Sequence, residues 1–247
     1  MNPTFNLKVP FKILATGETI DISPVSSAIE KSALEVQAIS DADNLDLVCE
    51  MYKIPANLPV PVKLAGLLKV REISSGSDCS LKYKCPCCGR ITENVILLED
   101  MLDFSHWEEV QAFKDLKLTD YGMQNLDKLH KCSSFELLRF FEVDPTGFSL
   151  ADFAQLKISA IARVPVFKES IDSRCILCGD IKKVRVDEEF VLKSLCTHDL
   201  KSLYQTYTKL VLNGFTKADV DGMLPFEREV QSGIIDRIIE DRKPQSN

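Results

Sequence analysis

Residues 82–91 read KYKCPCCGRI, and residues 174–181 read RCILCGDI. Each stretch has two cysteines separated by two residues, then a glycine, and an isoleucine two positions further on. A CxxC pair in a tight turn places two thiolates on one side of the backbone, where both can bind the same metal ion. The glycine after the second cysteine allows a positive φ, which lets the turn close. We name these predicted metal-binding turns the first knuckle (residues 85–89) and the second knuckle (residues 175–179).

The two knuckles together predict one structural zinc site, formed by Cys85, Cys88, Cys175 and Cys178, with one Zn²⁺ per chain. Four thiolates at about 2.3 Å complete a tetrahedral shell that leaves no position for a catalytic water. The competing interpretation is a redox dithiol, which would place one reactive CxxC at the N-terminus of a helix. Both knuckles instead lie between segments that favour β-strands, and this is typical of a zinc ribbon.

Other possible ligands lie near these motifs. Cys87 offers a third thiol in the first knuckle, and Cys196 and His198 form a Cys-x-His pair. The sequence alone leaves open whether either contributes to the site, whereas His106 and His130 have no evident partner and are expected to be structural. Cysteines outside the two CxxC pairs are expected to be small buried apolar residues. These are Cys49, Cys79, Cys87, Cys132 and Cys196.

The strands around the knuckles define a split ribbon. We expect strands over 79–84 and 91–98 around the first knuckle, and over 158–167 and 181–186 around the second. Residues of about 100–160 are mainly helical in pattern and form an insertion between the two halves. This insertion makes the ribbon's two halves distant in sequence.

The rest of the chain predicts an α+β protein with three segments. Residues 1–75 contain a β-hairpin over 5–23 and then helices, including one over 60–73. Residues 76–190 form the split zinc ribbon with its helical insertion. Residues 191–247 form a C-terminal helical segment.

Two apolar patterns mark the C-terminal helices. Leu203, Tyr207 and Leu210 belong to one stripe, and Pro225 is expected near the start of the last helix. Phe226, Val230, Ile234, Ile235, Ile238 and Ile239 form the apolar face of that helix. This face could dock on a partner protein, but packing on the protein's own core is the favoured interpretation.

Composition limits the class of protein. The formal net charge is −7 and 45% of residues are hydrophobic, as in an ordinary globular protein. No apolar stretch approaches the roughly 18 residues needed to span a bilayer, and the start lacks a signal-peptide pattern. We therefore expect a cytoplasmic protein without a membrane partner and without a disulfide framework.

Basic residues surround both knuckles and suggest an alternative function. They are Lys82, Lys84, Arg90, Arg174, Lys182, Lys183 and Arg185. A zinc-ribbon regulator that binds nucleic acid would use such residues against phosphates. Charge balance is the favoured explanation, since zinc with four thiolates carries a formal charge of about −2 that nearby cations relieve. The acidic total also argues against nucleic acid as a partner.

Catalytic motifs are absent from the sequence. It has no HExxH, GxSxG, P-loop or dinucleotide-binding fingerprint. The three histidines have no evident nucleophile beside them. We therefore expect a protein that is not an enzyme.

The order of motifs resembles a known family. The hairpin pattern PTFxLxVP (residues 3–10) with TGxxIxIxP (16–24) is followed by helices and then by KYKCPxCG (82–89). This order resembles the baseplate hub proteins of T-even-like contractile-tailed bacteriophages, a family with a hub subunit and a hub assembly factor. The resemblance covers residues 1–105, and the segment MLPFERE (223–229) resembles the terminal helix of such proteins.

The resemblance implies a non-enzymatic role in tail assembly. The protein would be a hub component or an assembly factor that acts through contacts with other hub and tail proteins. It would function in the host cytoplasm during assembly, with the tail baseplate of the virion as a further location. Zinc ligation carries over only to Cys85, Cys88, Cys175 and Cys178.

Overall fold

The computed structural model describes residues 7–13, 19–39, 44–103, 117–144, 146–162, 164–196 and 198–242. The strands are β1 (Val9–Lys12), β2 (Thr19–Ile22), β3 (Asp78–Lys84), β4 (Ile91–Leu97), β5 (Leu102–Asp103), β6 (Val166–Phe167), β7 (Ser170–Arg174) and β8 (Ile181–Arg185). The α-helices are α1 (Ser27–Ile39), α2 (Asn44–Met51), α3 (Val60–Ser75), α4 (Asp120–Gln124), α5 (Ser134–Phe140), α6 (Leu150–Ile161), α7 (Glu188–Ser194), α8 (Leu200–Leu212), α9 (Lys217–Gly222) and α10 (Pro225–Asp241). The 3₁₀ helices are η1 (Leu98–Met101) and η3 (Leu126–Lys131).

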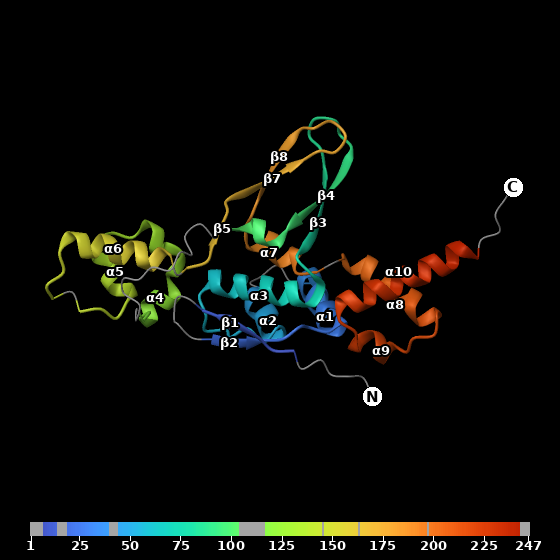
Figure 1. Cartoon of the computed structure of the whole chain (residues 1–247), viewed down its shortest axis with the longest axis horizontal. Coiled ribbons are helices and arrows are strands. Elements are labelled where there is room, and N and C mark those ends of the chain that lie inside the picture. The colour runs from blue at the N-terminus through green and yellow to red at the C-terminus, as the bar shows by residue number, and fades with distance from the viewer. Residues whose placement is uncertain are drawn as a thin grey trace.

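The molecule is elongated, and its two ends are both helical (Figure 1). The centre contains α1, α2, α3 and the hairpin β1–β2, while α4, α5 and α6 lie at one end and α8, α9 and α10 at the other. The hairpins β3–β4 and β7–β8 project together from the centre. The knuckles lie at the outer ends of these two hairpins, away from the main body.

The N-terminal hairpin and the helix over 60–73 are confirmed. Strands β1 and β2 pair antiparallel, with Phe11 opposite Ile20. The predicted turn of this hairpin lies outside the described residues. Helix α3 is buried over most of its length and ends at Gly76, whose φ of +90° suits glycine.

The described residues of the insertion between the knuckles are mainly helical, but the strand predicted over 158–167 is wrong. Residues up to Ile161 belong to α6. Ser149 caps the start of this helix, where its side chain accepts a hydrogen bond from the backbone N–H of Asp152. Only β6 within that range is a strand, and it pairs with β5. The strand that enters the second knuckle is β7, which lies further along the chain. His106 lies outside the described residues, and His130 belongs to η3.

Three separate hydrophobic clusters hold the described residues together. The largest joins the N-terminal hairpin, α1–α3, the insertion and α7. A second cluster belongs to α8, α9 and α10, and contains Leu203, Tyr207, Leu210, Val220 and Ile235. The third lies between the two knuckle hairpins and contains Tyr83, Cys85 and Cys175. The knuckle site therefore has a small core of its own, apart from the main one.

The C-terminal helices are confirmed, with one correction to their packing. Thr216 and Asp219 form a capping box at the start of α9, and Pro225 is at the start of α10, as predicted. The expectation that the apolar face of α10 packs on the protein's own core is wrong for five of its six residues. Ile235 is buried, but Phe226, Val230, Ile234, Ile238 and Ile239 are exposed. Helices of the length and apolar composition needed to cross a membrane do not occur in the described part of the chain.

Candidate metal centre

The two knuckles are built in the same way. In each, the backbone N–H of the first cysteine bonds to the carbonyl five residues later: Cys85 to Arg90 and Cys175 to Asp180, both at 2.8 Å. The glycine N–H then bonds to the carbonyl of the first cysteine, at 3.0 Å for Gly89 and 2.8 Å for Gly179. These two bonds close a tight turn at the end of each hairpin. The sequence match between the knuckles is therefore also a structural match.

Both knuckle glycines adopt the left-handed conformation that the sequence predicted. The φ angles are +68° at Gly89 and +77° at Gly179. A side chain rarely adopts this conformation, although space for a Cβ is open at both positions. Backbone conformation, and not crowding, therefore favours glycine in these turns.

The four predicted cysteines come together at one point. Their Sγ atoms all lie within 4.8 Å of one another. Across the knuckles, Cys85 Sγ lies 3.6 Å from Cys178 Sγ, and Cys88 Sγ lies 3.8 Å from Cys175 Sγ. A regular tetrahedron with metal–sulfur distances of about 2.3 Å has sulfur–sulfur edges of about 3.8 Å. The spacing therefore suits a tetrahedral metal ion, and it is too long for a disulfide of about 2.05 Å.

The backbone of the second knuckle stabilises a thiolate. The N–H groups of Cys178 and Leu177 point at Cys175 Sγ and lower the pKa of this thiol to about 6. Hydrogen bonds to the charged form of a group lower the pKa in this way. A metal ligand must be deprotonated, and here the turn favours the thiolate at Cys175. At Cys178 and Cys85 backbone N–H groups also act to lower the pKa, but burial and the neighbouring thiols outweigh them and raise it, to about 12 at Cys178.

Hydrogen bonds between the hairpins brace the site. Asn94 Nδ2 in β4 donates to Ser173 Oγ at 2.6 Å and to the carbonyl of Arg174 at 2.7 Å. The buried hydroxyl of Thr92 accepts a longer bond of 3.4 Å from the N–H of Ile176. Sequence reasoning missed these residues. The alternation of side chains along β4 could have identified them, because every second residue of a strand points to the same face and Thr92 and Asn94 share the face that packs on the second hairpin.

The other possible ligands lie elsewhere. Cys87 is exposed and does not belong to the group of four thiols. His198 Nε2 lies 2.8 Å from a carboxylate oxygen of Glu229, and Cys196 is buried in the main core. Burial is confirmed for Cys49, Cys132 and Cys196. Cys79 is half-buried against the main core, and Cys87 is exposed, so the prediction is wrong for Cys87. All nine cysteines are free thiols.

Charge on the knuckle hairpins is mainly positive and exposed. Lys84, Arg90, Arg174, Lys183 and Arg185 are exposed, whereas Lys182 is half-buried. The Lys182 ammonium lies 4.9 Å from the centre of the Tyr83 ring, a favourable cation–π distance. Positive charge near four thiolates offsets their negative charge.

Comparison with protein-family models, curated proteins and solved structures finds no match to this chain. The interpretation of the site therefore depends on its own geometry. Four cysteines from two equivalent turns lie close together and can bind a metal ion. With four protein ligands in place, a tetrahedral ion keeps no open position for substrate or water.

Proposed function

We propose that the four cysteines bind one Zn²⁺ ion, which joins the two knuckle hairpins as the halves of a split zinc ribbon. The observation that carries this proposal is the pair of sulfur–sulfur distances across the knuckles, 3.6 and 3.8 Å. Both agree with a tetrahedral Zn²⁺–thiolate site, whose edges are about 3.8 Å. Because the ligands come from segments far apart in sequence, the ion fixes the return of the chain after the helical insertion.

Measuring metal content tests this proposal. Purified protein should contain about one zinc per chain, and Cys175→Ser should lose it. Cys87→Ser is the matched control, because Cys87 is in the same knuckle but is exposed and outside the group of four. Its zinc content should stay at the wild-type value. Zinc-free wild-type protein with a reducible disulfide would support the redox dithiol instead.

The proposed role of the whole protein is non-enzymatic, as a baseplate hub component or hub assembly factor of a contractile-tailed phage. The resemblance of residues 1–105 to that family supports this role. A closed metal site, which stabilises a fold without offering a reactive position, is compatible with it. In this role the protein acts through its surfaces, and the metal maintains the shape of the projecting hairpins.

Co-expression with the other tail proteins of the same phage tests the role. Affinity capture of the tagged full chain should recover at least one hub protein, and mass spectrometry of purified virions should then distinguish a resident subunit from a transient factor. A capture without any tail protein, under conditions where known hub proteins capture each other, would contradict the proposal.

A second candidate function is binding of nucleic acid by the knuckle hairpins. Residues 78–97 and 170–185 together contain seven Lys or Arg residues and four Asp or Glu residues, so the hairpins are basic although the whole chain is acidic. An electrophoretic shift with DNA or RNA at low salt, lost as salt rises, would favour this function. Absence of a shift at low salt would exclude nucleic-acid binding by the knuckle hairpins.

A further inference from the structure

Solvent reaches the four knuckle cysteines to different extents. Cys85 and Cys175 are each 1% exposed, and Cys88 is half-buried. Cys178 is exposed, although its Sγ atom belongs to the same group of four. A reagent in solution therefore meets this group first at Cys178.

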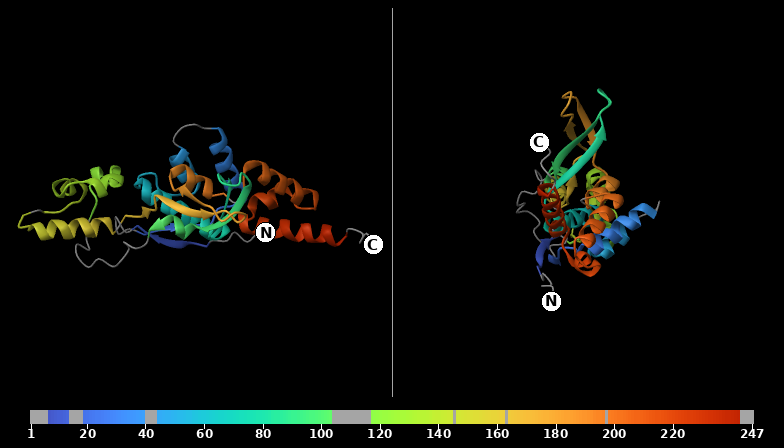
Figure 2. Two further views of the ribbon diagram at one scale, coloured as in Figure 1. Left: turned by 90° about the horizontal axis from the view of Figure 1, so that it is seen from above. Right: turned by 90° about the vertical axis from the view of Figure 1, so that its right-hand side faces the viewer.

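The position of each cysteine in its hairpin explains this difference. Cys85 and Cys175 directly follow β3 and β7, and both contribute to the small hydrophobic cluster that includes Tyr83. Cys178 lies further along its turn, beside Leu177, which is 52% exposed. The right-hand view of Figure 2 shows both knuckle hairpins projecting beyond the helices. The knuckles, at the outer ends of these hairpins, are therefore open to reagents in solution.

Exposure and charge together determine which cysteine reacts with an oxidant. The thiolate form of cysteine is both the metal ligand and the nucleophile that attacks oxidants. Susceptibility to oxidation follows thiolate character and exposure. All four ligands of the proposed zinc site are thiolates, so exposure selects Cys178 among them. Cys87 is exposed as well, but it lies outside the group of four.

A partner thiol for Cys178 lies on the other knuckle. Cys85 Sγ is 3.6 Å from Cys178 Sγ, and a disulfide bond between them requires about 2.05 Å. Each hairpin is a separate two-stranded sheet, so side-chain rotation with a small displacement between the sheets can close this gap. Cys85 Sγ also lies 3.9 Å from Asp180 Oδ2. A disulfide removes negative charge from beside this carboxylate, which favours Cys85 as the partner because like charges repel.

We propose that peroxide oxidises Cys178 and that Cys85 then forms a disulfide with it, so that the site loses its metal while the hairpins stay covalently joined. This inference rests on the proposed zinc site. The Cys178 thiolate first attacks one oxygen of hydrogen peroxide, which breaks the O–O bond, leaves a sulfenic acid on Cys178 and releases hydroxide. The Cys85 thiolate then attacks the Cys178 sulfur, which forms the S–S bond and releases a second hydroxide. Two thiolates lose two electrons in total, and the peroxide becomes two molecules of water after uptake of two protons from solvent.

The disulfide uses two of the four ligands. Cys88 and Cys175 remain, with their Sγ atoms 3.8 Å apart. Two thiolates leave a tetrahedral shell half complete, so the affinity of the site for zinc should fall steeply. A covalent bond then joins the hairpins at the point where the four thiolates met.

Hydrogen peroxide added to the purified, zinc-loaded full chain tests the proposal. A colorimetric zinc indicator should show release of about one zinc per chain, and reductant with added zinc should restore the metal content. Mass spectrometry after alkylation of free thiols should find a peptide pair linked through Cys85 and Cys178. A link between Cys175 and Cys178, within one knuckle, would overturn the proposal.

Two variants show which thiol reacts first. Cys178→His keeps a zinc ligand but removes the nucleophilic sulfur, so it should bind zinc and release it roughly tenfold more slowly or less in peroxide. Cys87→Ser removes an exposed thiol outside the group of four and should release zinc at the wild-type rate. Slower release from Cys87→Ser would overturn the proposal. Wild-type protein that contains zinc and keeps it in peroxide would also overturn it and leave the zinc site intact, whereas wild-type protein without zinc before oxidation would contradict the zinc site itself.

Discussion

The hydroxyl of Tyr83 donates a hydrogen bond of 3.0 Å to the backbone carbonyl of Ser173. Tyr83 precedes Cys85 by two residues and Ser173 precedes Cys175 by two, so the bond joins equivalent positions of the two knuckle hairpins. Both residues are buried. A buried hydrogen bond therefore joins the two hairpins beside the point where their four cysteines come together.

Replacing Tyr83 with Phe should destabilise the protein by about 1 kcal/mol, because a buried carbonyl loses its donor while the ring stays in place. Urea unfolding of zinc-loaded protein measures this change. Tyr204→Phe is the control, since its hydroxyl bonds to Glu35 at an exposed position, where water replaces the lost bond. The control should lower the free energy of unfolding less than Tyr83→Phe does. Equal decreases in both variants would show that the buried bond between the hairpins stabilises the protein no more than an exposed one.

Removing the proposed Zn²⁺ ion should loosen the hairpins and leave the helices folded. The cluster around Cys85 and Cys175 is separate from the main core and from the cluster of α8–α10. A chelator should therefore speed amide hydrogen exchange in β3, β4, β7 and β8, with little change in the helical circular dichroism signal. Loss of the helical signal together with the zinc would contradict this separation.

The sequence predicted the knuckles because their chemistry is local. A CxxC pair followed by glycine needs only a few residues to form its turn, and the structure places Cys85, Cys88, Cys175 and Cys178 together. The prediction of a strand over 158–167 was wrong because the local pattern of these residues competes with a helix that begins earlier in the chain. The β-branched residues among them favoured a strand, but the cap at Ser149 starts a helix that continues through Ile161.

The packing of α10 was beyond prediction from sequence. Its periodicity shows that apolar residues share one side, but periodicity does not tell which side faces the core. In the structure, Arg228 faces inward because Glu30 on α1 lies 2.6 Å from its Nη1 atom. This pairing joins residues 198 positions apart. A contact at that separation leaves no local pattern in the sequence.

Glycine substitutions should have opposite effects in the knuckle and in α10. Gly179→Ala should destabilise the protein by about 1 kcal/mol or more and weaken zinc binding, because the φ of +77° is strained for alanine. Gly233→Ala should stabilise it by about 0.5–1 kcal/mol, because alanine favours helix and nothing lies within 4 Å of the new Cβ. Thermal unfolding at low protein concentration compares them. A change of the same sign in both variants would contradict the assigned conformations.

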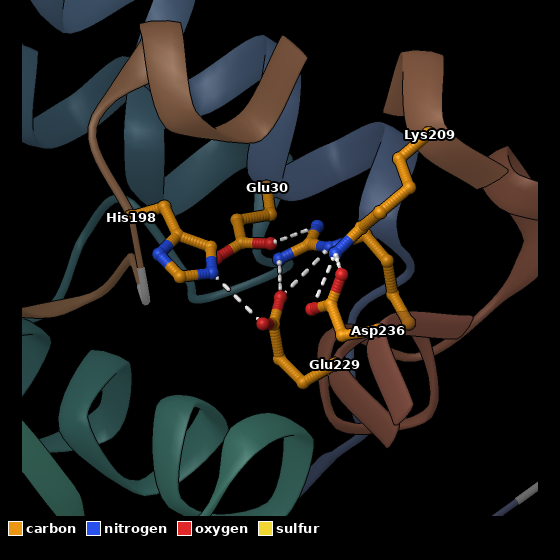
Figure 3. A network of polar contacts seen from close by, with 6 residues as sticks. Glu30, His198, Lys209, Glu229 and Asp236 are labelled. Atoms are coloured by element: carbon orange, nitrogen blue, oxygen red, sulfur yellow. Dashed lines mark hydrogen bonds and ion pairs between the residues drawn. The ribbon is translucent and has the colours of Figure 1, made fainter. Parts of the chain in front are cut away.

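Substitution of Arg228 should lower the free energy of unfolding more than most other substitutions. Its guanidinium is fully buried against Glu30, which is 1% exposed, and it also contacts Glu229 at 3.0 Å (Figure 3). Arg228→Met should destabilise the protein by about 3–5 kcal/mol, because Glu30 stays buried without its main counter-charge. Lys209→Met is the control, since it breaks a more exposed pair with Asp236 and should cost about 0–1 kcal/mol.

Replacing both partners of the buried pair separates the charge effect from packing. Glu30→Met with Arg228→Met removes both charges, so the double variant should recover much of the stability lost in Arg228→Met alone. Urea unfolding of the four proteins in this cycle gives the coupling between the two residues. Additive losses would show that Arg228 acts through its packing alone.

Acid should remove the contribution of Glu229 to stability. Burial alone would raise the pKa of this carboxyl, but the hydrogen bond with His198 and the charge of Arg228 outweigh it and hold the pKa below its ordinary value of 4.5. The folded state therefore binds the proton more weakly than the unfolded state. The stabilising contribution is present above pH 4.5 and is lost as pH falls through the lowered pKa.

Unfolding free energies of wild type and Glu229→Gln, measured from about pH 7 to about pH 3.5, test this prediction. The variant should be less stable at neutral pH, because it lacks the charge that faces Arg228 and His198. The difference should narrow below pH 4.5, since the unfolded wild-type chain then binds a proton that the folded state still excludes, and it should level off once the folded carboxyl is neutral as well. Loss of metal in acid affects both proteins alike, so the difference between them isolates Glu229. A difference that stays constant, or widens as pH falls, would show that Glu229 does not stabilise the fold through its charge.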